Sequence, residues 1–345
     1  MDKQIIAIII SLLISFGVTA LLGVVLIPLL RKLGLTQYIL TDIGPKWHRK
    51  KQGTPTSFGL GLMISVIFTV IISVFVCKSL GVELFPGLDN LKTKEFMKLA
   101  GGLILAVTLG AIGFADDYTK VAKRRNLGLT EMQKTIPQIL ISLVYLYCNF
   151  KVSGTEMAVP FAGMVDLKFF YWIFGVCVIY GAVNAVNFTD GVDGLCGSVT
   201  LTAALAFTVS AVLYKMTSVG ILGAALIGAC AGYLIWNRHP AKVMMGDTGS
   251  MFLGGLVVAL AYAIDMPIIL IFFGFIYVVE ALSDIIQIAS VKIRHEKVFL
   301  MAPIHHHCEQ LGWSENKIVA VFTIVNFLVC CGGVAIIFFG DARVL

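Results

Sequence analysis

Runs of about 20 apolar residues recur along almost the whole chain, and no other feature constrains the fold as strongly. A helix of about that length crosses the hydrocarbon core of a bilayer. Hydrophobic residues make up 58% of the 345 residues and charged residues only 13%, a balance that a soluble globule of this size could not cover with a polar surface. We therefore predict an all-α, polytopic integral membrane protein.

The apolar runs predict about ten transmembrane spans. They lie at approximately 4–30, 58–80, 98–114, 135–150, 168–186, 196–214, 218–236, 250–264, 267–287 and 318–340. The first run is too long for a removable signal peptide and leads directly into Arg31 and Lys32. Because no repeat or low-complexity linker interrupts the pattern, residues 1–345 are expected to form one membrane domain. Turn formers and alternating residues between 151 and 167 predict a small hairpin.

Basic residues are unevenly distributed between the loops. One alternating set of loops contains 17 of the 26 Lys and Arg residues, namely 31–57, 115–134, 187–195, 237–249 and 288–317. The positive-inside rule places this set in the cytoplasm and both termini on the periplasmic side.

Cysteine usage and net charge exclude two other classes of protein. The eight cysteines lie mostly inside apolar runs and form no CxxC pair, which is typical of packing rather than of a disulfide framework. The net charge of +6 comes from short loops beside spans and not from a basic folded domain, so we expect no nucleic-acid partner.

The first motif that could carry chemistry is the adjacent pair Asp116 and Asp117 at the end of the third predicted span. Two neighbouring carboxylates repel each other, so ionising both at a membrane boundary favours a bound cation or nearby basic groups. Basic residues follow the pair closely: Lys120, Lys123, Arg124, Arg125 and Lys134. A metal site or a proton-transfer role is indicated, and the alternative is a solvated helix end with lysines that set topology.

The second motif is NAVNFTDGVDG, which has no Lys or Arg and so does not serve topology. It cannot be an EF-hand loop, because Val192 occupies the third position and no glutamate closes the loop. Asn187, Asp190 and Asp193 are spaced three apart, which places them on one face if the segment is helical. The alternative is an ordinary turn.

The third motif is MGDTGS, which follows Asn237 at the end of a span. Glycines and a hydroxyl residue at a helix start expose backbone N–H groups to an anion, and Gly246 opens such a segment. The Gly-Lys-Ser/Thr ending of a Walker A loop is missing. Asp247 is then a candidate hard oxygen ligand, or else a plain helix cap.

Two further segments are basic. Three consecutive histidines, His305 to His307, cannot easily converge on one zinc ion, and the HExxH motif is absent. Their imidazoles are instead candidate hydrogen-bond donors to phosphate, or a general acid. The segment KWHRKKQGTPT contains Lys51 and Thr56, and its charge could equally set topology.

Together, carboxylates for a divalent ion, cations for phosphates and a scaffold in lipid indicate phosphoryl transfer between a water-soluble donor and a membrane acceptor. The main rival is a secondary transporter. Transporters place ionisable sites near the bilayer midplane, whereas these motifs lie at span ends.

The segments FADDYTK, NAVNFTDGVDGL, NRHPAKVMMGDTGS and MAPIHHHCEQLGW resemble the polyprenyl-phosphate N-acetylhexosamine-1-phosphate transferases over nearly the whole chain. The PIHHH segment is similar to the bacterial phospho-N-acetylmuramoyl-pentapeptide transferases rather than to relatives that transfer N-acetylglucosamine phosphate. The resemblance implies transfer of phospho-N-acetylmuramoyl-pentapeptide from UDP-N-acetylmuramoyl-pentapeptide to undecaprenyl phosphate. It also implies Mg2+, ten spans, a homodimer and a bacterial inner membrane, with the active site facing the cytoplasm.

The resemblance also implies roles for residues at matching positions. Asp247 corresponds to a magnesium ligand, and Asp116 with Asp117 to catalytic carboxylates. Other residues correspond to substrate contacts: Asn187, Asp190 and Asp193 for the nucleotide and diphosphate, His305, His306 and His307 for the donor, and Lys120 and Lys134 for anions. The remaining substrate-binding candidates are Lys51, Thr56, Asn237 and Gly246. The resemblance leaves open whether the lipid phosphate attacks directly or an aspartyl-phosphate forms first.

Four positions carry separate expectations. Phe58 replaces a glycine of the family's usual turn, and Met244 stands where relatives often carry phenylalanine, so the contacts to the nucleoside are expected to differ. Glu280 and Asp284 are costly inside a membrane, and we expect them at a bent helix end near a lipid groove.

Overall fold

The computed structural model describes residues 2–36, 51–82, 84, 90–123, 127–341 and 343. Arg124, Arg125 and most of the predicted loop 31–57 therefore lie outside the described residues.

Nine helices among the described residues are long and apolar enough to cross a membrane. They are α1 (Lys3–Lys32), α2 (Gly59–Leu80), α3 (Asn90–Ala122), α4 (Glu131–Ser153), α5 (Phe170–Thr189), α6 (Leu195–Leu213), α7 (Thr217–Asn237), α8 (Gly246–Ala263) and α12 (Glu315–Gly340). The tenth candidate is a bent pair: a turn of 3-10 helix, η2 (Pro267–Ile269), and α9 (Leu270–Phe273) meet α10 (Phe275–Arg294) at an angle of 88°. The prediction of an all-α polytopic protein is confirmed, and the chain is a multi-pass membrane protein.

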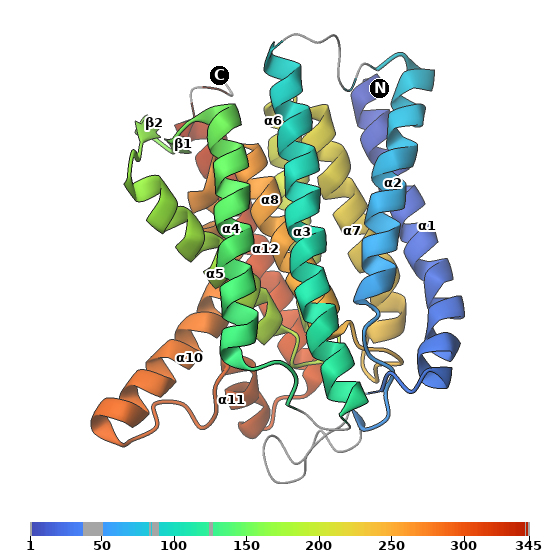
Figure 1. Ribbon diagram of the computed structural model, residues 1–345, viewed down its shortest axis with the longest axis vertical. Coiled ribbons are helices and arrows are strands. Elements are labelled where there is room, and N and C mark those ends of the chain that lie inside the picture. The colour runs from blue at the N-terminus through green and yellow to red at the C-terminus, as the bar shows by residue number, and fades with distance from the viewer. Residues whose placement is uncertain are drawn as a thin grey trace.

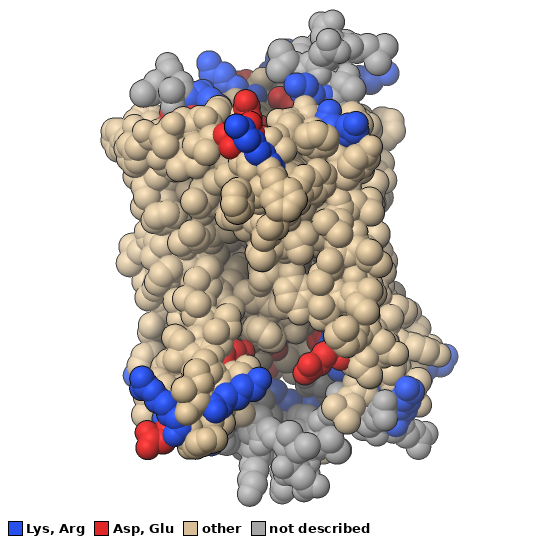
Figure 2. Space-filling view, turned by 60° about the vertical axis from the view of Figure 1, so that its left-hand side comes forward, with Lys and Arg blue, Asp and Glu red and all other residues tan. Residues whose placement is uncertain are grey.

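The helices run side by side along the long axis of the molecule (Figure 1). We call the end where α1 begins and α12 ends the terminal end, and the opposite end, where α3 ends and α8 begins, the motif end. Lysine, arginine and acidic side chains gather at both ends, and a broad band between them shows few charges (Figure 2). This distribution matches a bundle whose middle lies in lipid.

The most buried helix of the bundle is α8. Residues from Thr248 to Ala263 are buried, because α8 is apolar on every side and packs against neighbours all round. Small residues permit the closest approach: a Cβ on Gly113 of α3 would overlap the carbonyl of Asp247, and one on Gly59 of α2 would overlap the backbone of Gly249. The first turn of α8 is therefore held between α2 and α3.

The predicted hairpin is present at the terminal end. Strands β1 (Glu156–Val159) and β2 (Gly163–Asp166) pair antiparallel. Two backbone bonds fasten the hairpin to the bundle, from Ala158 to Asp265 and from Phe161 to Gly340.

The predicted helix boundaries were wrong where charged motifs follow an apolar run. Helices continue past the apolar residues, so most candidate site residues lie on helix ends and not on loops. Asp116, Asp117 and Lys120 lie in α3, Lys134 in α4, Asn187 in α5, Gly246 and Asp247 in α8, and the three histidines in α11 (Ile304–Gln310). Hydropathy marks where a helix leaves lipid, whereas the backbone bonds of a helix can continue into polar surroundings.

Candidate active site

Three carboxylates meet at the motif end. Asp116 and Asp117 belong to the last turns of α3, and Asp247 belongs to the first turn of α8. One oxygen of each carboxylate lies within 4.8 Å of the others. The close packing at Gly113 is what brings the two helices near enough for this cluster to form.

Asp117 caps the N-terminus of α8 from a neighbouring helix. Its Oδ1 accepts a hydrogen bond from the backbone N–H of Asp247 at 3.1 Å, and its Oδ2 accepts from the N–H of Thr248 at 3.1 Å. The hydroxyls of Thr248 and Ser57 donate to the same Oδ2 at 2.6 and 3.2 Å. A carboxylate suits a helix N-terminus, where unpaired N–H groups and the helix dipole favour negative charge. Asp117 thus fixes the turn that carries Asp247.

Asp116 and Asp247 face two ammonium groups instead. Lys120 Nζ lies 2.7 Å from Asp116 and 3.3 Å from Asp247, and Lys134 Nζ lies 3.0 Å from Asp116 and 2.7 Å from Asp247. Asp116 is fully buried, and its Oδ1 also accepts from the backbone N–H of Leu129 at 2.7 Å. Three carboxylates and two lysines leave this cluster with one net negative charge.

The cluster offers the donor set that a magnesium ion requires. Mg2+ binds carboxylate oxygens, one or two from the protein, together with substrate phosphates. Asp116 and Asp247 present such oxygens side by side, each already compensated by lysines. The residues therefore fit the ion that the family resemblance implies.

Thr56 and Gly246 lie beside this cluster because two distant loops pair with each other. Met244 donates its N–H to Pro55 O at 2.8 Å, and Phe58 donates to Met244 O at 3.1 Å. Gly246 has φ +68, and a Cβ there would overlap Asp117 Oδ2 and lie 2.9 Å from Thr56 Oγ1. Glycine is needed here both for the backbone and for space.

Phe58 does not disturb the turn in which it replaces a glycine. Its φ of −61 is ordinary for any residue, and the left-handed conformation falls on Ser57 at φ +67. The ring of Phe58 is fully buried and stacks on Tyr233 with centroids 5.4 Å apart. The aromatic residue thus supports the turn by packing beneath it.

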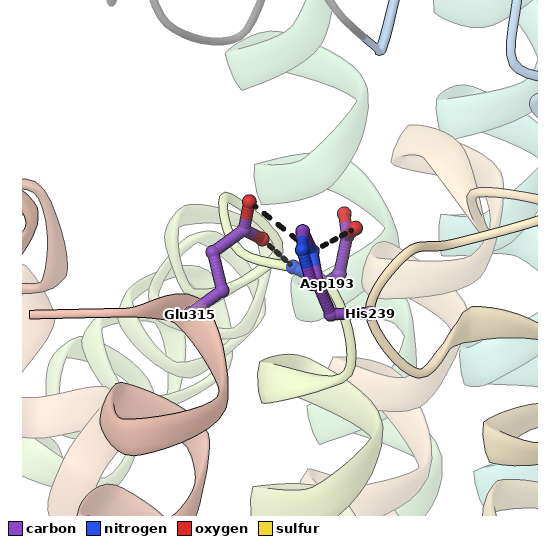
Figure 3. Close-up of side chains that lie close together, drawn as sticks. All are labelled: Asp193, His239 and Glu315. Atoms are coloured by element: carbon purple, nitrogen blue, oxygen red, sulfur yellow. Dashed lines mark hydrogen bonds and ion pairs between the residues drawn. The ribbon is translucent and has the colours of Figure 1, made fainter.

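A second polar cluster lies next to the first and contains Lys51, Asp193, His239 and Glu315. His239 lies between the two carboxylates, with Nδ1 at 3.0 Å from Asp193 and 3.5 Å from Glu315 (Figure 3). Lys51 Nζ lies 2.7 Å from Asp193 and 2.8 Å from Glu315. Burial works to lower the pKa of Lys51, but the two carboxylates outweigh it and hold that pKa above its ordinary value. The ammonium therefore neutralises one of the two carboxylate charges in this cluster.

A cavity of about 210 Å³ opens beside this second cluster. Met244 lines it together with Lys51, Asp193, His239 and Glu315. A few apolar side chains and several hydrogen-bonding groups around a small cavity suit a flat polar ligand.

The predicted shared face of Asn187, Asp190 and Asp193 does not form, because α5 ends at Thr189. Asn187 donates to Ser250 Oγ at 2.8 Å, next to the first turn of α8, whereas Asp193 turns to the second cluster. Burial, together with the nearby negative charges of Asp247 and Asp117, raises the pKa of Asp190 well above its ordinary value.

Asn237 is buried, and its side-chain amide forms hydrogen bonds with backbone groups. Its Oδ1 accepts from the N–H of Gly194 at 2.9 Å and its Nδ2 donates to Val243 O at 2.9 Å. These bonds join the turn after α5 to the loop before α8, and its contact with substrate stays a prediction.

The three histidines face three different partners. His305 Nδ1 lies 3.0 Å from Glu280 Oε2, and His306 Nδ1 lies 2.6 Å from Glu309 Oε2. His307 Nδ1 accepts from the backbone N–H of Leu300 at 3.2 Å. This arrangement agrees with the expectation that the three imidazoles do not converge on one ion.

The structure adds residues that sequence reasoning missed. Glu315 accepts from Lys51 Nζ and from the backbone N–H of Asp193, and so joins α12 to two distant loops. In the sequence it follows Ser314 at the start of a span, a pattern that indicates only a helix cap. Ser57, which binds Asp117, carries no sequence signal beyond its polarity. Thr248 belongs to the MGDTGS motif, but its bond to Asp117 was not predicted.

An apolar groove runs between α5 and α10, with a volume of about 240 Å³. Its walls include Val178 and Ala185 of α5 and Val278, Ala281 and Leu282 of α10. Leu282 is 48% exposed, so the groove reaches the outer surface of the bundle. The chain bends at Gly274, where α9 ends and α10 begins. Glu280 and Asp284 lie within α10 and not at this bent end, so their expected place at a helix end is not what the structure shows.

Comparison with known proteins agrees with these features. Residues 99–265 match the family described as glycosyl transferase family 4. A phospho-N-acetylmuramoyl-pentapeptide-transferase of Clostridium botulinum is 43% identical over 94% of this chain and 94% of its own. Proteins with the same name from Bacillus velezensis and Caldicellulosiruptor bescii are 39% and 37% identical, over 94% and 95% of this chain and 96% and 97% of their own.

Proposed function

The chain belongs to the phospho-N-acetylmuramoyl-pentapeptide-transferase family, and on that premise we propose that it transfers phospho-N-acetylmuramoyl-pentapeptide from UDP-N-acetylmuramoyl-pentapeptide to undecaprenyl phosphate. The products are lipid I and UMP, in the first membrane step of peptidoglycan synthesis. The observation that carries the proposal is the meeting of Asp116, Asp117 and Asp247 with Lys120 and Lys134 at one end of a membrane bundle.

The motif end faces the cytoplasm in this proposal, and the membrane is the bacterial inner membrane. The basic loops support this orientation, because the loops of the cytoplasmic set join helices at the motif end. Both termini are then periplasmic. The homodimer implied by the resemblance stays a prediction.

The acceptor's prenyl chain occupies the groove between α5 and α10. The groove is lined by apolar side chains and reaches the surface that faces lipid. Ala185 lines it only about a turn before Asn187 and Asp190. A chain lying in the groove would therefore bring its phosphate toward the carboxylates.

The donor's nucleoside occupies the cavity beside Met244. Backbone and side-chain groups of the second cluster offer hydrogen bonds to a uracil ring, and Met244 offers a polarizable apolar contact in place of an aromatic ring. This placement puts the diphosphate between the two clusters, near Lys120 and Lys134.

Asp247 would hold Mg2+ when the donor binds. When bound, the ion supplies Lewis-acid neutralisation of charge on the diphosphate oxygens. Lys120 and Lys134 lie within 3.3 Å of Asp247 and add fixed positive charge at the same place.

Asp116 is the candidate base. Asp117 is occupied by two backbone N–H groups and two hydroxyls, whereas Asp116 faces the lysines and has fewer fixed partners. Asp116 takes the proton of the lipid phosphate, whose oxygen then forms a bond to the β-phosphorus of the donor. The bond from that phosphorus to the bridging oxygen breaks, and UMP leaves with the electron pair.

A two-step route through an aspartyl-phosphate is the competing mechanism. Incubation of the purified enzyme with radiolabelled donor but without lipid would accumulate a phosphorylated protein in that route. We expect no such species. A labelled aspartate recovered from the protein would eliminate direct attack as the sole path.

The proposed function is tested by UMP release from purified protein given undecaprenyl phosphate and either the muramoyl-pentapeptide donor or UDP-N-acetylglucosamine. We expect magnesium-dependent release from the muramoyl donor alone. UMP release with the N-acetylglucosamine donor alone would show that the chain is an N-acetylglucosamine-phosphate transferase. UMP release with neither donor would contradict the proposed activity.

A further inference from the structure

Glu280 and His305 form a buried pair that the reaction described above does not use. Their exposed fractions are 0% and 1%. His305 Nδ1 lies 3.0 Å from Glu280 Oε2, and the backbone N–H of His305 lies 3.5 Å from the same oxygen. A carboxylate is an acceptor, so the pair assigns the imidazole proton to Nδ1 and fixes the plane of the ring.

The other ring nitrogen of His305 has no hydrogen-bond partner within the described part of the chain. This atom, Nε2, lies against Gly191, where an added Cβ would overlap it. Gly191 belongs to the turn that carries Asp190 and Asp193. A buried acceptor without a partner is costly unless a ligand or water satisfies it, so Nε2 is directed at a place that becomes occupied.

The helix that carries Glu280 has two faces with different neighbours. Val278, Ala281 and Leu282 line the apolar groove. Glu280 falls between them in sequence, and helical spacing turns it to the other side, toward α11 and His305. α10 therefore lines the proposed acceptor groove on one side. On the other side it holds His305, which packs against the turn that carries Asp193 of the proposed donor cavity.

We propose that Glu280 is a positioning residue that couples the two substrates: an isoprenoid phosphate in the groove sets α10, and α10 through Glu280 sets His305 against the turn that receives the nucleotide donor. This coupling rests on the proposed function for the identity of both ligands. The proposal requires that α10 shift as a unit about its bend at Gly274 when the groove is filled.

The test is donor binding without turnover. The affinity for UDP-N-acetylmuramoyl-pentapeptide is measured in nanodiscs without magnesium, with and without undecaprenyl phosphate. In the wild-type protein we expect the lipid to tighten donor binding about tenfold, in the range usual for allosteric coupling. In Glu280→Gln the ratio is expected to fall to near one. Equal ratios in the two proteins, or a ratio of one in the wild type, would overturn the coupling.

Two further variants separate positioning from loss of fold. His305→Gln breaks the same pair from α11 and is expected to abolish coupling to the same extent, with no further loss in the double variant. Glu280→Asp keeps an acceptor with a shorter reach and is expected to restore part of the coupling. Additive losses in the double variant would show that the two residues act independently and would contradict the proposal.

A matched control is Glu296→Gln, which removes an exposed negative charge just beyond α10 without touching the pair. Coupling is expected to be unchanged. Nitrogen NMR of labelled histidine gives a readout independent of substrates: the signal that His305→Gln removes should report a proton on Nδ1 in the wild type, and Glu280→Gln should change it. An unchanged signal would exclude the pair even if the chain proved to act on another donor.

Discussion

At the terminal end Lys98 binds both oxygens of Asp265, at 2.6 and 2.7 Å, and Arg343 binds both oxygens of Asp341, whereas at the motif end three carboxylates share two ammonium groups. A carboxylate with a cation of its own has its charge balanced within the bundle. Carboxylates that share cations keep oxygens available for a ligand and repel one another until it arrives.

This contrast separates the ion pairs at the terminal end, which stabilise the bundle, from the carboxylates at the motif end, which we propose take part in the reaction. Lys98 joins α3 to the link after α8, and Tyr214 and Arg343 join the ends of α6 and α12 through Asp341. These pairs hold helices together far from the carboxylate cluster. The same residue types therefore serve different purposes at the two ends, and substitutions should divide accordingly.

The largest effect is expected from Asp247→Ala at the motif end. Turnover should fall by about 10³-fold, because several kcal/mol of charge stabilisation depend on this carboxylate. The unfolding temperature should change little, since Asp247 is partly exposed and its partners are lysines. Activity and thermal unfolding measured on one preparation, with magnesium or a chelator, check both statements. Magnesium-dependent turnover at the wild-type rate would remove Asp247 from the site.

Next come Asp116→Asn and Asp117→Asn, which should differ although the residues are neighbours. Asp117→Asn should lower both activity and stability, the latter by about 1–2 kcal/mol, because a helix cap is weakened. Asp116→Asn should lower turnover by about 10²-fold with a smaller loss of stability. Chemical denaturation and turnover, both measured on each variant, distinguish the two residues. Equal stability losses would show that the two carboxylates share one role.

A smaller effect, on stability alone, is expected from Asp265→Asn at the terminal end. Asparagine keeps the left-handed backbone of Asp265 at φ +56 but removes the charge that faces Lys98, whose side chain is 8% exposed. The expected cost is about 1 kcal/mol, below that of a fully buried pair because Asp265 is partly exposed. Turnover should match the wild type at temperatures where the variant is folded. A loss of turnover there would mean that the two ends are not independent.

The smallest effect is expected when the pH is lowered and Asp341, at the terminal end, takes up a proton. Burial alone would raise the pKa of Asp341, but hydrogen bonds from Arg343 and Tyr214 outweigh it and lower that pKa to about 2 from 3.8. A lowered pKa means that the stabilisation is present above 3.8 and is lost as the pH falls toward 2. Thermal unfolding between pH 5 and pH 2 should show a loss of a few degrees or less that Asp341→Asn lacks. An identical acid response in the variant would assign the loss to other groups.

The membrane class, the span count and the hairpin could be predicted because they follow from apolar run length and turn chemistry. The ends of α3, α5 and α8 could not, because hydropathy says where lipid ends and not where helical hydrogen bonding ends. That difference decides whether Asp193 shares a face with Asn187.

The sequence indicated which residues are candidates for the site, but it did not indicate which residues they contact. Adjacent aspartates look alike in sequence, yet Asp117 caps α8 and Asp116 meets lysines, a distinction set by the contact between α3 and α8. Glu315 was missed because its partners lie more than a hundred residues away. Long-range pairs of this kind leave no local pattern to read.

The bend at Gly274 also bears on how an acceptor arrives. Because α10 diverges from the upright helices (Figure 1), the groove beside it is entered from the side, within the plane of the bilayer. A long isoprenoid then never has to be extracted into water, and the search for the enzyme takes place in two dimensions within one leaflet. We expect turnover to follow the surface density of the acceptor among the lipids and not its amount per volume of solution.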